Sequence, residues 1–445
     1  MIQFRNGFYA DIRTEDRNRT TISYNAGVLE EIKTRVERRA FLRVYDGKLW
    51  YYASVTDLEH LQRTLDGLYA AATENPHILE DPVVRRFERN RDEVLHFADC
   101  SVRDVPQKEK QALLLSYLPL LSEDSCVTMP RGVYVDRNSL MHFQSSLGAD
   151  ITYDYQTCGM AFYCSMAEGD KKFSGHWQKG ATRFDELKGL EPEIRAAVAE
   201  QTAFLRNSVP VVPGKYPVVL SPEAAGVFAH ESFGHKSESD FMLSDESMRE
   251  EWQLGKQVGA PILTIAEWGE VPGSGYVPYD DEGTRARKNY LIKDGVLAGR
   301  LHNAQTAAAL DEDVTGNARA IDCTFEPIVR MTTTYIEGGR ENFDQLIAPI
   351  QKGYFIKTIR HGSGMSTFTI APSLAYEIVD GKLGRPVQIS VLTGSVFETL
   401  GLIDGLTEDV HLLSFVTGGC GKMEQQGLPV GFGDPYVRVS SMNVQ

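Results

Sequence analysis

The sequence predicts an α+β fold, with an α/β N-terminal region that combines a mixed sheet and helices, followed by a β-rich C-terminal domain. Three patterns indicate this: strand-like alternation over 151–166, helical periodicity over 192–206, and a proline-rich stretch at 207–222 between regions of different character. A chain of 445 residues has room for two or three domains. We predict an N-terminal region at 1–210, with a subdivision near residue 100, and a C-terminal domain at 211–445.

The first ninety residues alternate strand-like stretches with one predicted helix. That helix is expected to begin at Thr56, whose hydroxyl can cap it while Glu59 completes a capping box. An apolar stripe follows at helical spacing, made of Leu58, Leu61, Leu65, Leu68 and Tyr69. A second helix is predicted near 107–121.

Strand periodicity is clearest in the segment that follows the second helix. The residues that recur at every second position are Ile151, Tyr153 and Tyr155, and then Met160, Phe162, Cys164 and Met166. Gly169-Asp170 predicts a turn after this segment. The next helix is predicted at about 192–206.

The pattern changes after the proline-rich stretch 207–222, because four prolines in sixteen residues remove backbone donors and block helix formation. A helix is predicted from 222 to about 236, with Ser221 as its cap, Pro222 at its first position and Glu223 complementing its dipole. Beyond it, many short strands separated by glycines are expected, with some helix near 301–311 and 340–350.

Composition excludes several classes of function. The net charge is −15 and the sequence contains no basic run, so nucleic acid is not an expected partner. The longest apolar runs are too short to cross a bilayer, and the N-terminus lacks the features of a secretory signal. We therefore expect a cytoplasmic protein that does not bind membranes. Its six cysteines form no CxxC pair and are expected to be mainly free thiols.

The predicted helix at 222–236 carries His230, Glu231 and His235. Two histidines beside a glutamate suggest a metal-dependent peptidase, in which the glutamate accepts the proton of an activated water. The usual pair lies four residues apart, about 40° around a helix, whereas five residues give about 140°. A local π-turn would bring the two rings back to one side, and Gly234 would tolerate a distorted backbone there.

A metal site of this kind needs a third ligand. Cys420 lies between glycines and between two apolar strands, so its backbone could bring a thiolate close to a metal. The residues alone leave the alternatives open: histidine pairs are often ordinary core or surface groups, and a lone cysteine in a turn is more often a small apolar residue.

Several segments of the C-terminal half resemble the TldD/PmbA family of metallopeptidases. They are "HESFGHKSESD" (230–240), "YDDEGTRARKNYLIKDGVLAGRLHN" (279–303), "TGNARA" (315–320), "RMTTTYIEGG" (330–339), "AYEIVDGKLGRPVQISVLTGS" (375–395) and "GGCGKMEQQGLPVGFGDPYVRVS" (418–440). The first segment is similar to the motif of the catalytic, TldD-like type, which PmbA-like partners lack. The N-terminal half resembles the family more loosely.

The resemblance implies zinc (Zn²⁺) bound by His230, His235 and Cys420, with Glu231 as the general base. It also implies a dimer around an internal cavity, formed either as a homodimer or as a heterodimer with a PmbA-like subunit. Two further motif residues, Glu238 and Asp240, would either orient a ligand histidine or solvate the helix end.

Two segments depart from the family pattern. Where the TldD-like type usually has a glycine pair, this chain has "RHGSGMSTFTIAPS" (360–373), and "TGNARA" lacks an arginine that often follows it. His361 in the first of these is either a donor to the transition state or a loop histidine without a role.

We therefore expect a zinc-dependent peptidase that hydrolyses unfolded or small peptides. A cysteine hydrolase that uses Cys420 is a second hypothesis, but it leaves Glu231 and the paired histidines unexplained. A third is a zinc-stabilised regulatory or scaffold protein without peptidase activity. A structural zinc would have four protein ligands, and the sequence indicates three.

Overall fold

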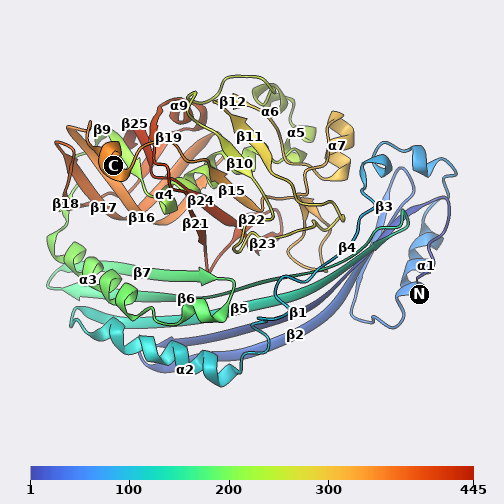
Figure 1. The fold of residues 1–445 in the computed structure, drawn as a ribbon, viewed down its shortest axis with the longest axis horizontal. Helices are drawn as coiled ribbons and strands as arrows, with labels where there is room; N and C mark the ends of the chain where they lie inside the picture. Colours follow the sequence, from blue (N-terminus) through green and yellow to red (C-terminus); the bar gives the residue numbers. More distant parts are fainter. Residues whose placement is uncertain (1) are drawn as a thin grey trace.

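The computed structural model describes residues 2–445 and contains a long, curved sheet that lies beneath a larger β-rich part (Figure 1). This sheet has seven strands in the order β3-β2-β1-β5-β6-β4, with β7 pairing to β6. The strands are β1 Tyr9–Asn25, β2 Val28–Tyr45, β3 Trp50–Val55, β4 Arg91–Val94, β5 Val127–Ser145, β6 Asp150–Glu168 and β7 Lys171–Ala181.

The sheet is mixed, as predicted, but only β4 runs parallel to its neighbour β6. All the other pairs are antiparallel. Short connections explain this for consecutive strands such as β1 and β2, whereas β1 and β5 pair although they are far apart in the sequence. The repeated strand–helix–strand crossovers that define an α/β sheet are not seen in this region. The prediction of a mixed α+β protein is confirmed, whereas the α/β description of the N-terminal region is wrong.

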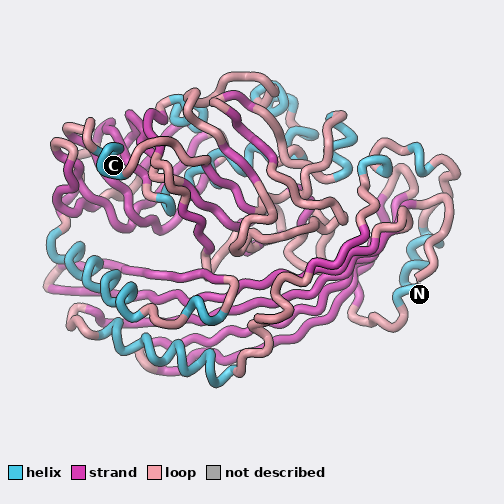
Figure 2. Tube along the Cα trace, in the orientation of Figure 1, coloured by secondary structure: helices cyan, strands magenta, loops and turns pink. Residues whose placement is uncertain are grey.

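Along strand β6, the apolar residues shift from odd-numbered positions (151–155) to even-numbered positions (160–166). Ile151 and Tyr153 lie on one face, where Tyr279 from the C-terminal part packs against them. Met160 and Phe162 lie on the opposite face, which α2 and α3 cover (Figure 2). Each half of the strand is therefore buried on a different face, and each keeps the period of two.

Three helices accompany this sheet: α1 Leu61–Ala71, α2 Gln107–Tyr117 and α3 Glu191–Asn207. The second and third agree with the predicted ranges, and α2 passes into a 3₁₀ turn at Leu118–Ser122 that contains a proline. The apolar stripe of the first helix also packs as predicted.

The predicted start of the first helix is wrong. Thr56 does not cap it, because the side chain of Asp57 accepts the N–H of Glu59 at 3.2 Å and forms a turn there. The helix therefore begins only at Leu61, after His60, whose side chain makes no capping hydrogen bond.

The C-terminal part contains two larger sheets and two short strand pairs. The eight-stranded sheet comprises β8 Val209–Pro210, β9 Gly214–Leu220, β16 Lys352–Gly364, β17 Thr367–Val379, β18 Lys382–Gln388, β19 Leu392–Ser395, β20 Ile403–Leu406 and β25 Val437–Val444. The six-stranded sheet comprises β10 Ile265–Glu267, β11 Asn289–Lys293, β12 Val296–Leu297, β15 Thr333–Ile336, β21 His411–Ser414 and β24 Gly431–Asp434. The two pairs are β13 Ala318–Arg319 with β14 Ile328–Val329, and β22 Cys420–Lys422 with β23 Gln425–Leu428.

The helices of this part are short. They are α4 Pro222–Ala229, α5 Asp240–Ser244, α6 Glu246–Glu251, α7 Ala304–Leu310, α8 Phe343–Ile347 and α9 Val396–Gly401. Helix was predicted where α4, α7 and α8 lie, but not at α5, α6 or α9. Within residues 2–445, no helix combines the length and apolar character that a membrane crossing needs.

Helix α4 lies between the two larger sheets, where it packs against β16 and β24 (Figure 1). Its apolar residues belong to the largest core, in which Phe228 is buried against Phe368 and Phe233 against Trp252. Burial on both sides fixes this helix firmly in the middle of the C-terminal part. The predicted division into residues 1–210 and 211–445 stays a prediction.

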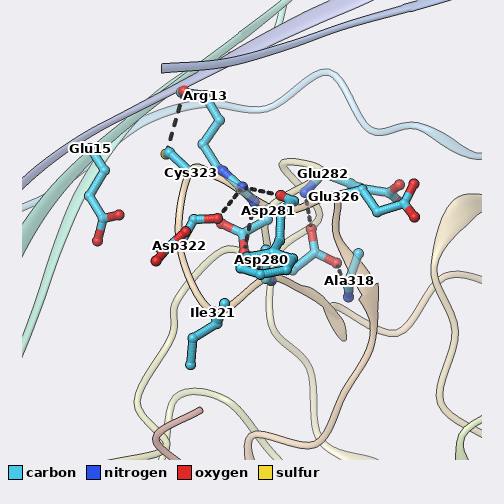
Figure 3. A network of polar contacts seen from close by, with 12 residues as sticks. Arg13, Glu15, Asp280, Asp281, Glu282, Ala318, Ile321, Asp322, Cys323 and Glu326 are labelled. Atoms are coloured by element: carbon cyan, nitrogen blue, oxygen red, sulfur yellow. Dashed lines mark hydrogen bonds and ion pairs between the residues drawn. The ribbon is translucent and has the colours of Figure 1, made fainter. Parts of the chain in front are cut away.

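Buried ion pairs join the long sheet to the C-terminal part. Arg13 on β1 pairs with Asp281 at 2.9 Å and donates to the carbonyl of Asp322 at 3.1 Å (Figure 3). Arg43 on β2 similarly pairs with Glu282 at 3.1 Å. Removing one partner of such a buried pair is costly, so these contacts fix the position of the long sheet relative to the C-terminal part.

Candidate metal centre

The helix that carries the two histidines begins as the sequence predicts. The Ser221 hydroxyl accepts the N–H of Ala224 at 3.2 Å, and regular α-helix continues from Pro222 to Ala229. The backbone then widens into a π-helical turn over His230–Gly234, in which the N–H of His235 bonds to the carbonyl of His230. The predicted bulge is therefore confirmed. It places the two imidazole rings with centroids 5.1 Å apart.

Gly234 serves a different purpose from the one predicted. Its backbone has φ −56° and ψ −51°, an ordinary right-handed helical conformation that any residue can adopt. A Cβ atom at this position would lie 2.1 Å from Sδ of Met331. The glycine is required because Met331 packs directly against the turn, not because the backbone is strained.

Cys420 approaches the histidines from the other end of the C-terminal sequence. Gly418 and Gly419, with φ of 97° and 143°, make a turn that residues with side chains rarely adopt. The turn brings the Cys420 Sγ to 3.5 Å from the Nε2 of His235. One ligand atom each from His230, His235 and Cys420 lies within 4.8 Å of the other two.

The segment before Cys420 rests on the N-terminal sheet. The N–H of Val416 donates to the side chain of Gln178 at 3.0 Å, and the Thr417 hydroxyl lies 2.7 Å from the hydroxyl of Tyr163. A Cβ at Gly180 would lie 2.5 Å from the carbonyl oxygen of Ser414. Both parts of the fold therefore position the thiol, and no local pattern in the sequence pointed to Gln178 or Tyr163.

Glu238 holds the ring of His235. Its Oε2 lies 3.1 Å from the Nδ1 of His235 and 3.1 Å from the Nζ of Lys422, which also bonds to Asp240. Burial opposes ionisation of Glu238, but the hydrogen bond with His235 and the charge of Lys422 outweigh it and lower its pKa. An ionised Glu238 makes Nδ1 the donor and leaves Nε2 free to bind a metal beside Cys420.

Asp240 bonds to Lys422 and makes no contact with His235. Any effect of Asp240 on His235 therefore passes through Lys422 and Glu238. Lys422 was not among the predicted site residues. It lies two residues after Cys420 on a strand, which puts both side chains on one face.

The chemistry of the three residues fits a bound metal. His230 is buried, and its Nδ1 has no hydrogen-bond partner within residues 2–445. Such an orphaned nitrogen is costly unless something binds it. Burial would raise the pKa of Cys420, but His230 and His235 outweigh it and lower the pKa well below its usual value. The thiol is therefore poised to ionise, and the thiolate is the form that binds metals.

The other cysteines differ in this respect. Burial raises the pKa of Cys323 to about 12 and also raises that of Cys158. The pKa values of Cys100, Cys126 and Cys164 are likewise raised by burial. Two imidazoles and one thiolate are a ligand set typical of zinc, with a fourth position left for water or substrate.

Glu231 follows His230 directly in the sequence but does not belong to this three-residue group. It is half-buried, and burial raises its pKa even though His230 and His235 act in the opposite direction. The hairpin of β16 and β17 crosses it closely, since a Cβ at Gly364 would lie 3.0 Å from the Glu231 carbonyl oxygen. Because burial disfavours its charged form, this carboxyl is a better proton acceptor than a fully solvated one.

A cavity of about 650 Å³ opens onto these residues. Strands β1, β5, β6 and β7 form one wall, and the other wall comes from α4 with the π-turn that follows it, from β16 and from the loop before Cys420. His361 is exposed and lines the cavity, outside the three-residue group. The cavity is large enough for several residues of a peptide.

Comparisons with known proteins agree with this arrangement. The sequence profile of the PmbA/TldA metallopeptidase C-terminal domain matches residues 213–445, and that of domain 1 matches residues 10–72. A metalloprotease from Synechocystis sp. is 32% identical over 98% of this chain and 94% of its own length. A zinc metalloprotease TldD homolog from Saccharolobus solfataricus is 31% identical, over 54% of this chain and 53% of its own. The crystal structure of TldE from Thermococcus kodakarensis has the same fold, with a TM-score of 0.77 at 16% identity, over 98% of this chain and 96% of that one.

Proposed function

The chain belongs to the TldD/PmbA family of metallopeptidases, and we propose that it is a zinc-dependent peptidase that hydrolyses unfolded or small peptides. The observation that carries this proposal is the convergence of His230, His235 and Cys420 beside Glu231 at the wall of a cavity. A relative that matches half of the chain is named a zinc metalloprotease, which supports the choice of metal.

Each residue has a definite task in this proposal. Zinc held by the two histidines and the cysteine would supply a Lewis acid that polarises the scissile carbonyl and acidifies a water. Glu231 accepts the proton of the attacking water and passes it to the amine that leaves. Glu238 keeps the Nε2 of His235 directed at the site. His361, which lines the same cavity, is available to donate to the developing oxyanion.

The substrate class follows from the backbone around the cavity. Strand β16 pairs with β9 only over Tyr354–Ile356, and Ser221 and Glu223 bond to the main chain of Lys357 and Ile359 beyond it, so the edge at 360–362 is the part of β16 that lines the cavity without a second paired strand. An extended peptide could pair with this edge through main-chain hydrogen bonds, which recognise shape more than sequence. A folded protein offers no free strand, so it would not enter.

We expect the zinc-loaded protein to cleave a disordered protein such as casein and to leave a stable folded protein of similar size intact. A chelator should abolish cleavage, and added zinc should restore it. Digestion followed by mass spectrometry, with metal content measured in parallel, checks this. Cleavage that is insensitive to the chelator would favour a cysteine hydrolase, and zinc binding without cleavage would favour a scaffold. Equal cleavage of both proteins would contradict the proposed substrate class.

We also propose that the protein works as an assembly of two subunits. Strand β2 pairs with β3 only over Ala40–Tyr45, so residues 28–39 form a free sheet edge. This edge exposes Val28 (68%), Val36 (55%), Leu29 (42%) and Ile32 (38%). Leu29, Ile32 and Val36 are opposite Tyr24, Ile22 and Asn18 on β1, so they continue the apolar face on which Ile22 is buried. Long, exposed apolar edges favour pairing with another chain.

Removing this apolar edge should separate the subunits. The protein should elute at about twice its 49.6 kDa, either alone or with a PmbA-like subunit, and the double change Ile32→Lys and Val36→Lys should give monomers. Light scattering measures the mass, and Leu79→Lys, at another exposed apolar residue, is the matched control. This interface would be overturned if the unchanged protein were a monomer both alone and with a PmbA-like subunit, or if the dimer survived the double change.

A further inference from the structure

Three arginines lie side by side across the N-terminal sheet. In the strand register, Arg19 on β1 is directly opposite Arg35 on β2 and Arg137 on β5. Directly opposed residues share one face of a sheet, and like charges in that position repel. Partial burial is the largest cause that lowers the pKa of Arg19, and the charges of Arg137, Arg17 and Arg35 lower it further. The fold therefore maintains an unfavourable cluster of positive charge.

Neighbouring arginines on the same strand are neutralised, whereas in this row only Arg137 has partners: it lies 3.5 Å from Glu15 and donates to the hydroxyl of Tyr155 at 2.7 Å. Arg13 pairs with Asp281 at 2.9 Å (Figure 3), and Arg17 pairs with Glu15 at 2.7 Å. Within residues 2–445, neither Arg19 nor Arg35 has an ion pair or a side-chain hydrogen bond. Arg19 and Arg35 therefore have no carboxylate partner within the described part of the chain.

The row leads into the cavity that contains the metal ligands. Arg19 and Arg137 both line this cavity, as do Arg131 and Arg360. Two residues along β5 from Arg137, Val135 is opposite Gly159, and a Cβ at Gly159 would lie 2.5 Å from Val416. Val416 belongs to the segment that ends at Cys420. The arginine row is therefore about 7 Å along the sheet from the wall that supports the thiol.

Few acidic groups in the cavity oppose this positive charge. The side chain of Asp136 is on the opposite face of the sheet from Arg137, and there it lies 2.6 Å from the Nζ of Lys110. Glu223 is engaged by the N–H of Ile359 at 2.9 Å, and Glu231 is the proposed base. Screening at physiological salt acts over about 8 Å, so the arginines determine the potential felt by a peptide inside.

We infer that the row Arg35–Arg19–Arg137 is a carboxylate-binding subsite, and that the enzyme prefers peptides with aspartate or glutamate near the cleaved bond. This inference rests on the proposed peptidase function. Arginine suits the role because its planar guanidinium binds a carboxylate through two parallel hydrogen bonds. A peptide extended along the cavity would place its acidic side chains on the row and relieve the repulsion among the three arginines.

The test uses the full-length, zinc-loaded protein and two disordered peptides that differ only in glutamate or glutamine at positions flanking the cleaved bond. We expect kcat/KM to be about five- to tenfold higher for the glutamate peptide, the size expected for two partly screened ion pairs. This preference should shrink as salt is raised. In the variant with both Arg19→Gln and Arg35→Gln it should fall below about twofold. Arg63→Gln on α1, an exposed arginine far from the cavity, is the matched control.

A binding measurement separates this inference from the proposed function. Fluorescence anisotropy of the same two peptides with Glu231→Gln, which lacks the proposed base, reports the preference without cleavage. The glutamate peptide should bind more tightly, and the two arginine changes should remove the difference. Equal affinity for both peptides, or a preference that survives the arginine changes, would overturn the subsite whether or not cleavage occurs. A preference in binding without cleavage would support the subsite and contradict only the proposed peptidase.

Discussion

Replacing Glu231 with glutamine should lower kcat by about 10²–10⁴-fold while the protein keeps its zinc, because the change removes a proton acceptor and no ligand. Glutamine has the same shape as glutamate but cannot take the proton of the attacking water. Glu231 lies outside the three-residue ligand group, so the metal content should not change. Peptide hydrolysis and zinc content, measured on the same preparation, test both halves of the expectation.

Glu223→Gln provides the matched control for this change. Glu223 is on the same helix and lines the same cavity, but it bonds to the N–H of Ile359 and is seven positions from the first histidine. Its replacement should affect activity far less. If Glu231→Gln kept activity within a factor of about three of the parent, Glu231 would not be the base.

Replacing Cys420 with serine should remove most of the bound zinc and, with it, the activity. A serine hydroxyl stays protonated at neutral pH, whereas two imidazoles lower the pKa of the cysteine thiol and favour the thiolate that binds metal. Loss of a residue that only orients a ligand costs about 10–100-fold in metal affinity, so loss of the ligand itself should cost more than that. Zinc affinity, measured by competition with a chromophoric chelator, reports the change.

Two other buried cysteines serve as controls for this substitution. Cys323 donates to the carbonyl of Arg13 at 3.7 Å, and Cys158 lies on β6 with a pKa that burial raises. Cys323→Ser and Cys158→Ser should therefore retain zinc. Unchanged zinc affinity in Cys420→Ser would mean that the ligand set is wrong.

The features that the sequence predicted correctly depend on neighbours within one or two turns. Ser221 caps α4 as predicted, because a hydroxyl and the N–H three residues on meet in almost any context. The five-residue spacing of His230 and His235 predicted the π-turn, because no regular α-helix can bring both rings to one side. Strand β6 followed equally well from its period of two.

Local patterns failed where two short-range contacts compete or where contacts come from a distance. Thr56 and Asp57 both offer caps, and the fold selected the turn at Asp57, beside Ser54, whose hydroxyl bonds to the distant carbonyl of Cys323. The antiparallel order of the long strands was also missed, because each strand pattern is compatible with either direction of pairing.

The sequence by itself determined the helix, its bulge and two candidate ligands, because those rest on residues next to one another. Only the tertiary structure brought Cys420 to His235, which is 185 positions away, and Lys422 to Glu238. It alone aligned Arg19 with Arg137 across two strands and set that row beside the cavity. Contacts of this kind depend on how sheets pair and pack over long separations, and a one-dimensional pattern carries no record of that pairing.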